Sequence, residues 1–429
     1  MSDFEKGREG RPKRYFSVSK EKREYGPGIR RSPIILANPD RDSVPEKNKQ
    51  PTQQQHQTTI ILRNREGSSF PTQRPSSSNA VRKETEIQPL YQLAAKHAPG
   101  ENISNTLSQP PEMRGSVKLL DDNLQVLQDA ILEYLLDQGN NEFLVVGVVG
   151  SLGVGKSTLM SLLAGGQSKP FAPQRIQQQE LGGQGTLGVD VFVTPDRLIL
   201  LDTQPMLSPA AADRLAAQDP TKRHDFISAE GAVETQSLQL TAFLMTVCHV
   251  VILVQDWFFD PTVVRFIQTA EMLKPSTTVF NADDELVEYY PHLLLVHTKT
   301  SPDDYNPGNV SLMQDVYSQT FARSNLQLQS GLGIANGSVI NILSPEVCGE
   351  PINMFLLPDL GEEESSLLYH GHPGLTTLID NLRSQLLSVE RNALTHSPLT
   401  EKNWFQYASR MWDVIKKNSF FLEYYRLLP

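Results

Sequence analysis

The sequence predicts an α/β fold in which a mostly parallel β-sheet is flanked by helices. An apolar, strand-forming segment at residues 143–149 leads directly into GSLGVGKS at residues 150–157. This octapeptide matches the phosphate-binding loop motif GxxxxGK[ST], and helix-forming residues follow it, as the mechanism of the motif requires. Apolar strand segments and helical patterns then alternate as far as residue 387. That alternation is typical of a doubly wound phosphate-loop NTPase fold.

Local patterns predict the elements around the loop. Upstream of it, apolar residues recur at helical spacing behind an acidic pair, which predicts an amphipathic helix over residues 121–138. Residues 189–193 and 198–201 flank a Thr-Pro-Asp-Arg turn, so we expect them to form a β-hairpin. Residues 250–254 are apolar throughout, which is typical of a central parallel strand.

Further elements complete the alternation. Pro261 occupies a favoured first position for a helix that extends to residue 273. A polar insert is expected at residues 275–288. The remaining expected elements are helices at 234–247, 313–323 and 375–387 and strands at 293–296 and 354–357.

The first quarter of the chain has the composition of an unfolded segment. Residues 1–110 are rich in Pro, Ser, Gln and Asn and lack the apolar periodicity that offsets ordering entropy. Three β-prone segments in it, at residues 32–36, 59–62 and 89–93, are either docking segments for partners or chance apolar clusters. We therefore expect a disordered N-terminal tail over residues 1–110.

Charge divides the chain at the same place. The tail holds 19 basic residues (Lys and Arg) and 12 acidic residues (Asp and Glu). Residues 111–429 hold the remaining 20 basic and 37 acidic residues, which gives this part a net charge of −17. A body this acidic argues against direct nucleic-acid binding. Two cysteines are too few for a disulfide framework, and no apolar stretch has the length of a membrane span. We expect a protein of the cytosol or nucleus with no membrane partner.

The body divides into two predicted parts. Residues 111–398 are expected to form a G-domain-like nucleotide-binding domain, and residues 399–429 a C-terminal helical extension rich in aromatic residues. The extension either packs back onto the domain or presents an aromatic stripe to a partner. Its apolar residues recur at near-helical spacing: Trp404, Tyr407, Met411, Ile415, Phe420 and Tyr424.

The phosphate-binding loop assigns roles to its residues. Gly150, Gly153 and Gly155 let backbone N–H groups converge on the phosphates. Lys156 reaches the β and γ oxygens, and the hydroxyl of Ser157 can hold Mg²⁺ at the start of the following helix. The motif therefore predicts a nucleotide site with Mg²⁺.

The segments after the loop resemble the GTPase branch of the phosphate-loop proteins. Two adjacent strands follow, and the second ends in Asp202. The resemblance implies that Asp202 holds Mg²⁺ through water. It also implies that Thr186, in a glycine-rich loop, binds Mg²⁺ and senses the γ-phosphate.

The catalytic segment departs from the GTPase pattern. Where a GTPase has Asp-x-x-Gly and a catalytic Gln, this chain has Asp202-Thr-Gln-Pro-Met206. Pro205 has no N–H to offer the γ-phosphate, and Met206 cannot orient a water molecule. Gln204 lies two positions too early for that role. We therefore expect weak or absent hydrolysis and no enzymatic role.

Base recognition is also altered. After the strand at 293–296 a GTPase has Asn-Lys-x-Asp, whereas this chain has Thr-Lys-Thr-Ser at 298–301. Lys299 can pack on the base, but the aspartate that rejects adenine is absent, unless Asp303 or Asp304 replaces it. The sequence predicts a purine nucleotide, GDP/GTP or ADP/ATP, without deciding between them.

Several longer sequences resemble the SMG-nine family of nonsense-mediated mRNA decay factors, over the whole body. They are LLDQ at 135–138, LDTQP at 201–205, TVCHVV at 246–251, VQDW at 254–257, TAEM at 269–272, KPST at 274–277, YYPH at 289–292 and TEKNWF at 400–405. The resemblance implies that Mg²⁺ lies near Ser157, Thr186 and Asp202. The phosphate-lining residues that it implies are Gly150, Gly153, Gly155, Lys156, Ser157 and Thr158. We expect Val154, Thr298 and Lys299 to belong to the nucleotide site as well.

The same resemblance implies a regulatory role. It implies a non-catalytic subunit that pairs with a larger G-domain-like SMG partner. Together, the two would bind and restrain the SMG kinase, a relative of the phosphatidylinositol 3-kinases that phosphorylates the UPF helicase. The alternative, motivated by the intact loop, is an active GTPase switch that controls assembly of a protein complex. An RNA-binding module has only the basic cluster at residues 11–14 in its favour.

Overall fold

A computed structural model describes residues 111–427 except for 138–139, 167–168, 174–184, 218–227, 257, 281–284 and 361–370. The predicted tail, with its three candidate docking segments, lies outside the described residues, as does most of the glycine-rich loop before Thr186. Within the described ranges, no helix combines the length and the apolar character that crossing a membrane requires.

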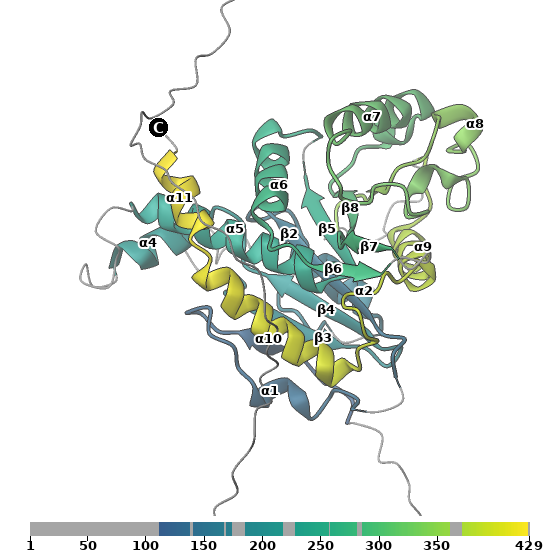
Figure 1. Cartoon of the computed structure of the whole chain (residues 1–429). Coiled ribbons are helices and arrows are strands. Elements are labelled where there is room, and N and C mark those ends of the chain that lie inside the picture. The colour runs from purple at the N-terminus through teal and green to yellow at the C-terminus, as the bar shows by residue number, and fades with distance from the viewer. Residues whose placement is uncertain are drawn as a thin grey trace, which may run out of the picture. The chain divides into compact units, whose positions relative to one another are not determined.

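Seven strands form one sheet in the order β1-β3-β4-β2-β5-β8-β9. Figure 1 labels β3, β4, β2, β5 and β8 among these strands. β3 (Val189–Val193) runs antiparallel to β4, as the predicted hairpin requires, and β1 (Val117–Leu120) pairs antiparallel with β3. Every residue of β2 and β5 is buried, which explains why these strands are apolar without alternation. The mutually parallel strands are β2 (Leu144–Gly150), β4 (Leu198–Thr203), β5 (Val250–Gln255), β8 (His292–His297) and β9 (Met354–Leu356).

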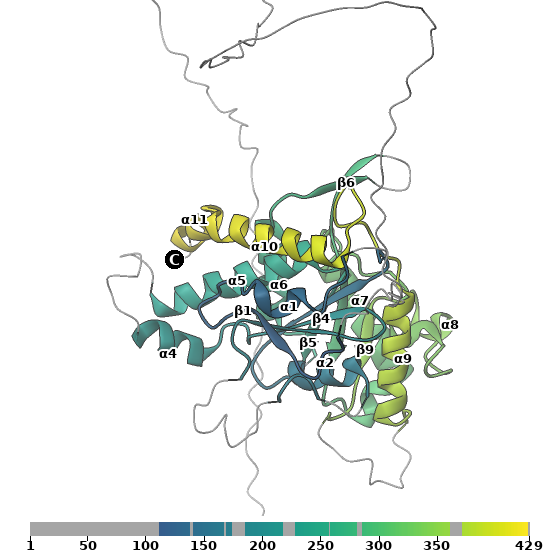
Figure 2. The same cartoon turned by 90° about the horizontal axis from the view of Figure 1, so that it is seen from below.

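Helices flank the sheet, which confirms the predicted fold class. α2 (Lys156–Ala164) and α9 (Leu375–Ser388) pack together on one side, and α5 (Ala229–Val247) and α6 (Pro261–Leu273) pack together on the other (Figure 2). Further described helices are α1 (Asp129–Leu132), α4 (Pro209–Ala217), α7 (Pro307–Thr320) and α8 (Pro345–Cys348), with 3₁₀ turns η2 (Pro302–Tyr305) and η3 (Ile334–Asn336).

Polar caps explain where the helices begin. α6 begins at Pro261 as predicted, because the Asp260 carboxylate accepts a hydrogen bond from a first-turn N–H. α5 begins before the predicted position 234, because the Ser228 hydroxyl accepts a hydrogen bond from the backbone N–H of Gly231. α7 begins before the predicted position 313, because Asn306 caps it in the same way.

The predicted helix over residues 121–138 is wrong. β1 precedes this segment, a turn follows, and only the short α1 is helical. The Asp121 carboxylate accepts hydrogen bonds from the backbone N–H groups of Asn123 and Gln125, both at 2.8 Å. These local bonds compete with helical ones, and Leu124 takes a left-handed conformation with φ of 57°. The apolar spacing there reflects burial of single residues such as Leu124 and Ile131, rather than one helical face.

The polar insert at 275–288 forms a small separate hairpin. Its strands, β6 (Thr278–Phe280) and β7 (Leu286–Glu288), pair antiparallel with each other outside the main sheet. No sequence pattern had indicated strands in this insert.

The C-terminal extension packs back onto the domain. α10 (Glu401–Lys417) and α11 (Phe420–Leu427) lie along α5 (Figure 2). The side chains of Trp404 and Trp412 are fully buried, and each indole N–H donates a hydrogen bond to a backbone carbonyl, of Val247 and Leu124 respectively, at 2.8 Å. The packing interpretation therefore holds for these aromatic residues, while Phe420 stays 62% exposed.

Candidate nucleotide site

The phosphate-binding loop lies at the carboxyl edge of the parallel strands. β2 ends at Gly150, and α2 begins at Lys156. Gly153 and Gly155 have φ of 80° and 96°, a left-handed conformation that residues with a Cβ rarely adopt. The loop therefore turns at the N-terminus of α2, where the backbone N–H groups of the first helical turn can donate hydrogen bonds to an anion.

Lys156 is buried at the base of this loop. Its ammonium group donates hydrogen bonds to the carbonyl oxygens of Gly150, at 3.0 Å, and Ser151, at 2.8 Å. Burial lowers its pKa to about 8, although the charge of Asp202 opposes that shift. At neutral pH the side chain remains mostly protonated and can attract phosphate oxygens.

The three predicted Mg²⁺ residues converge. The hydroxyls of Ser157 and Thr186 donate hydrogen bonds to Oδ2 of Asp202, at 2.7 and 2.8 Å, and lie 3.1 Å from each other. Oδ1 of Asp202 is buried and makes no hydrogen bond to any described residue. Burial raises the pKa of this carboxyl group, against the hydrogen bond from Ser157 and the charge of Lys156.

This cluster fits a magnesium ion. Its donors are hard oxygens, which Mg²⁺ prefers, and one carboxylate oxygen of Asp202 makes no hydrogen bond to a described residue. A divalent cation there would also offset the burial of negative charge that raises the pKa of Asp202. When bound, the ion would neutralise phosphate charge.

Two residues of the segment after Asp202 make hydrogen bonds within the protein. The backbone N–H of Met206 donates to Gly150 O at 3.0 Å, and the Met206 side chain is buried. The side-chain oxygen of Gln204 accepts a hydrogen bond from the N–H of Gly188 at 3.1 Å. Pro205 lines the site but has no N–H. Neither Pro205 nor Met206 therefore has a free N–H or a polar side chain to offer a γ-phosphate or a water molecule.

A cavity of about 280 Å³ occupies the predicted phosphate site. Of the predicted site residues, four do not line it: Gly150, Val154, Asp202 and Thr298. Sequence reasoning missed Asp359, which lines the cavity just after β9; its place at the carboxyl end of a parallel strand was the available signal. The predicted residues that line the cavity are Gly153, Gly155, Lys156, Ser157, Thr158, Thr186 and Lys299.

The segment at residues 298–301, which corresponds to the base-recognition motif of a GTPase, contacts the phosphate-binding loop through Thr298 and Lys299. The Thr298 hydroxyl donates to Val154 O at 2.8 Å. The Lys299 ammonium donates to Gly153 O at 3.3 Å and forms an ion pair with Asp256 at 3.0 Å. The segment therefore packs on the loop although its asparagine position holds a threonine.

Ser301 occupies the position of the missing aspartate. Its hydroxyl and its backbone N–H both donate to Oδ2 of Asp304, at 3.0 and 2.7 Å. Since its proton goes to Asp304, the Ser301 oxygen offers only lone pairs to a ligand.

Comparison with known proteins assigns the family. No family model matches the chain. The nonsense-mediated mRNA decay factor SMG9 of Xenopus tropicalis is 38% identical over 94% of this chain and 88% of its own length. The SMG9 of Salmo salar is 37% identical over 94% and 89%. The chain belongs to the SMG9 family of nonsense-mediated mRNA decay factors. The resemblance seen in the sequence is thereby confirmed.

More distant SMG9 proteins also match the chain. The Caenorhabditis elegans SMG9 is 28% identical over 59% of this chain. Among solved structures, Toc33 from Arabidopsis thaliana in complex with GDP and Mg²⁺ is 16% identical, covering 58% of this chain and 88% of that one, with a TM-score of 0.30. The bacterial elongation factor EF-Sec covers 51% and 26%, at 12% identity and a TM-score of 0.24.

Proposed function

We propose that this SMG9-family protein is a non-catalytic regulatory subunit whose G-domain-like fold binds a purine nucleotide and turns it over slowly or not at all. The observation that carries this proposal is the contrast within one site. Support for binding comes from Ser157, Thr186 and Asp202, which converge beside the loop that carries Lys156. Support for slow turnover comes from Pro205, which has no N–H, and from Met206, whose side chain is apolar. A nucleotide that binds only the folded state would stabilise it without turnover.

The proposed partners come from the family resemblance. We propose that the chain pairs with a larger G-domain-like SMG subunit. The pair binds and restrains the SMG kinase, a relative of the phosphatidylinositol 3-kinases. We place this complex in the cytosol, and part of it in the nucleus. The test is phosphorylation of the UPF helicase by the purified kinase, with and without the pair. Unchanged kinase activity and no co-elution with the kinase would sink this part of the proposal.

The nucleotide itself is tested by extraction. The folded protein is denatured, and the released nucleotide is identified by chromatography, in the wild type, in Lys156→Ala and in the control Lys169→Ala, which removes an exposed lysine. We expect about one nucleotide per chain in the wild type and control and a large loss in Lys156→Ala. Equal amounts in all three proteins would contradict the assignment of the site.

The second candidate is an active GTPase switch. It is favoured by the convergence of Ser157, Thr186 and Asp202, because these residues can link Mg²⁺ to a γ-phosphate. It predicts multiple-turnover hydrolysis and a partner affinity that differs between the diphosphate and triphosphate states. Equal affinities in the two states would exclude it, since a ligand shifts an equilibrium only through differential binding.

A further inference from the structure

The segment at residues 186–188, which joins the nucleotide site to β3, is held by contacts on two sides. On the side of the nucleotide site, the Thr186 hydroxyl donates a hydrogen bond to Asp202 at 2.8 Å. On the other side, the ammonium group of Lys118, in β1, donates a hydrogen bond to the carbonyl oxygen of Leu187. Contacts within the protein therefore position the residue that corresponds to the γ-phosphate sensor of a GTPase.

Lys118 belongs to a row of charged side chains across three neighbouring strands. The register pairs Lys118 of β1 with Asp190 of β3, and Asp190 with Asp202 of β4. Residues that lie directly opposite each other in antiparallel strands place their side chains on the same face of the sheet. Lys118 and Asp190 form an ion pair, with Nζ 2.8 Å from Oδ1. This ion pair keeps the ammonium group within reach of Leu187, the residue after Thr186.

Gly188 is held by two further hydrogen bonds and by close packing. Its N–H donates to Oε1 of Gln204 at 3.1 Å, and its carbonyl oxygen accepts from the N–H of Gln204 at 2.9 Å. Gly188 has φ of 65°, and a Cβ at this position would collide with the carbonyl oxygens of Leu120 and Asp121. The segment at 186–188 therefore lies directly against the end of β1.

These contacts involve only protein atoms. In a GTPase, the γ-phosphate and Mg²⁺ order the corresponding segment, and hydrolysis releases it. A segment that Lys118 and Gln204 already hold gains little order from a γ-phosphate. Because a ligand shifts a conformational equilibrium only through differential binding, such a segment responds weakly to the change from diphosphate to triphosphate.

We propose that Lys118 is a positioning residue that keeps Thr186 in one place in both nucleotide states, so that the protein does not respond to the γ-phosphate. Lys118 does not line the nucleotide cavity and acts through Leu187. The strand β1, which precedes the phosphate-binding loop in the sequence, thereby regulates the nucleotide site. This inference rests on the proposed nucleotide binding.

The test is hydrogen exchange of the backbone N–H groups of Gly188 and Gln204. The hydrogen bonds of these two groups do not involve Lys118, so faster exchange in Lys118→Met reports opening of the segment. The full-length protein is measured free of nucleotide, with Mg²⁺ and GDP, and with Mg²⁺ and the non-hydrolysable triphosphate GMPPNP. ADP and AMPPNP are measured in parallel.

We expect the two exchange rates of the wild type to agree within about threefold between the diphosphate and triphosphate states. In Lys118→Met, exchange in the diphosphate state should be at least about tenfold faster than in the wild type, because a hydrogen bond from a charged donor is lost. The triphosphate should then slow it at least about fivefold, because the γ-phosphate now orders the segment. A larger difference between states in the wild type overturns the proposal, as does wild-type exchange in Lys118→Met.

Further variants separate positioning from general stability. Lys118→Arg keeps a positive charge and several N–H donors, and it should restore most of the protection. Lys402→Met is the matched control, because the Lys402 side chain has the same 33% exposure and also forms an ion pair, with Asp137. Amides of β5 serve as the internal reference. Exchange in Lys118→Arg as fast as in Lys118→Met, or a parallel loss of protection in β5, overturns the proposal.

The nucleotide-free samples separate this inference from the proposed function. If no nucleotide binds, the proposed function fails, but faster exchange in Lys118→Met still shows that Lys118 holds the segment. Equal exchange in the wild type and Lys118→Met overturns the inference even where nucleotide binds with full occupancy.

Discussion

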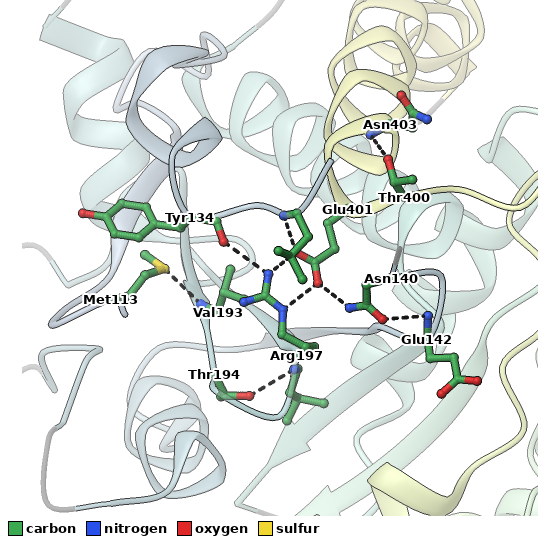
Figure 3. Close-up of polar contacts among 12 residues, drawn as sticks. Met113, Tyr134, Asn140, Glu142, Val193, Thr194, Arg197, Thr400, Glu401 and Asn403 are labelled. Atoms are coloured by element: carbon green, nitrogen blue, oxygen red, sulfur yellow. Dashed lines mark hydrogen bonds and ion pairs between the residues drawn. The ribbon is translucent and has the colours of Figure 1, made fainter. Parts of the chain in front are cut away.

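Arg197, on the turn between β3 and β4, forms an ion pair with the fully buried carboxylate of Glu401, the first residue of α10 (Figure 3). Its Nε lies 2.7 Å from Oε1 of Glu401. The same carboxylate accepts hydrogen bonds from the backbone N–H of Leu136 and the side chain of Asn140, both at 2.8 Å. One side chain thus connects the C-terminal helix to the sheet and to the segment that precedes β2.

Removal of this carboxylate should loosen the C-terminal helix. We expect Glu401→Ala to lower the free energy of unfolding by about 3 to 5 kcal/mol, because it leaves a partly buried guanidinium and two N–H donors without an acceptor. Glu401→Gln keeps one acceptor oxygen and should cost about 1 to 3 kcal/mol. Urea unfolding measures both, with exposed Glu423→Gln as the control. A Glu401→Ala protein as stable as the control would show that the ion pair contributes nothing.

The sequence predicted those parts of the fold that depend on local patterns. The strands β2, β5 and β8 are apolar because they are buried on both faces, and the loop before Lys156 fixes a strand, a turn and a helix in order. The segment around Asp121 escaped prediction because side-chain hydrogen bonds and a left-handed Leu124 override its apolar spacing. The hairpin at β6 and β7 lacked a pattern altogether.

The site was predictable to a similar extent. Ser157, Thr186 and Asp202 follow from motif order, because the carboxyl ends of parallel strands meet at one edge. Contacts between residues that are distant in the sequence could not be predicted from the motifs. The pairing of Arg197 with Glu401 and the burial of His297 beside Tyr317 depend on tertiary packing, and single-sequence periodicity carries no information about it.

His249 should make the protein sensitive to acid. Its Nδ1 accepts a hydrogen bond from the N–H of Val145 at 3.0 Å, and burial lowers its pKa to about 3. Because the unfolded chain binds this proton near pH 6.5, stability is full above that pH and falls as the pH drops from 6.5 toward 3. Between pH 7 and 4.5, this one residue should cost about 3 kcal/mol.

Replacement of His249 by a residue that does not titrate tests this. His249→Gln should show a smaller drop in urea midpoint between pH 7 and 4.5 than the wild type, even if it is less stable at pH 7. His396→Gln, which changes an exposed histidine, should retain the wild-type pH dependence. Parallel pH profiles for wild type and His249→Gln would assign the acid sensitivity to other groups.

Thr298 should link stability to nucleotide retention. Thr298→Val has nearly the same shape but leaves the buried carbonyl of Val154 without its donor, so we expect a loss of about 1 to 2 kcal/mol in unfolding free energy. Faster nucleotide release should accompany it, because that carbonyl belongs to the phosphate-binding loop. Thr298→Ser keeps the hydroxyl and should retain the wild-type release rate. If Val and Ser variants release nucleotide equally fast, the hydrogen bond does not hold the loop.

Ser301 should set how well the site distinguishes the two purines. Guanine presents two adjacent N–H donors to the aspartate of a GTPase, whereas the Ser301 oxygen, whose proton is given to Asp304, is a single weak acceptor. Ser301→Asp combined with Asp304→Asn restores a carboxylate at this position and avoids repulsion between two acids. We expect the ratio of GDP to ADP affinity to rise at least about tenfold, measured by calorimetry, relative to Asp304→Asn alone. An unchanged ratio would mean that Ser301 does not face the base, and that selectivity lies elsewhere in the site.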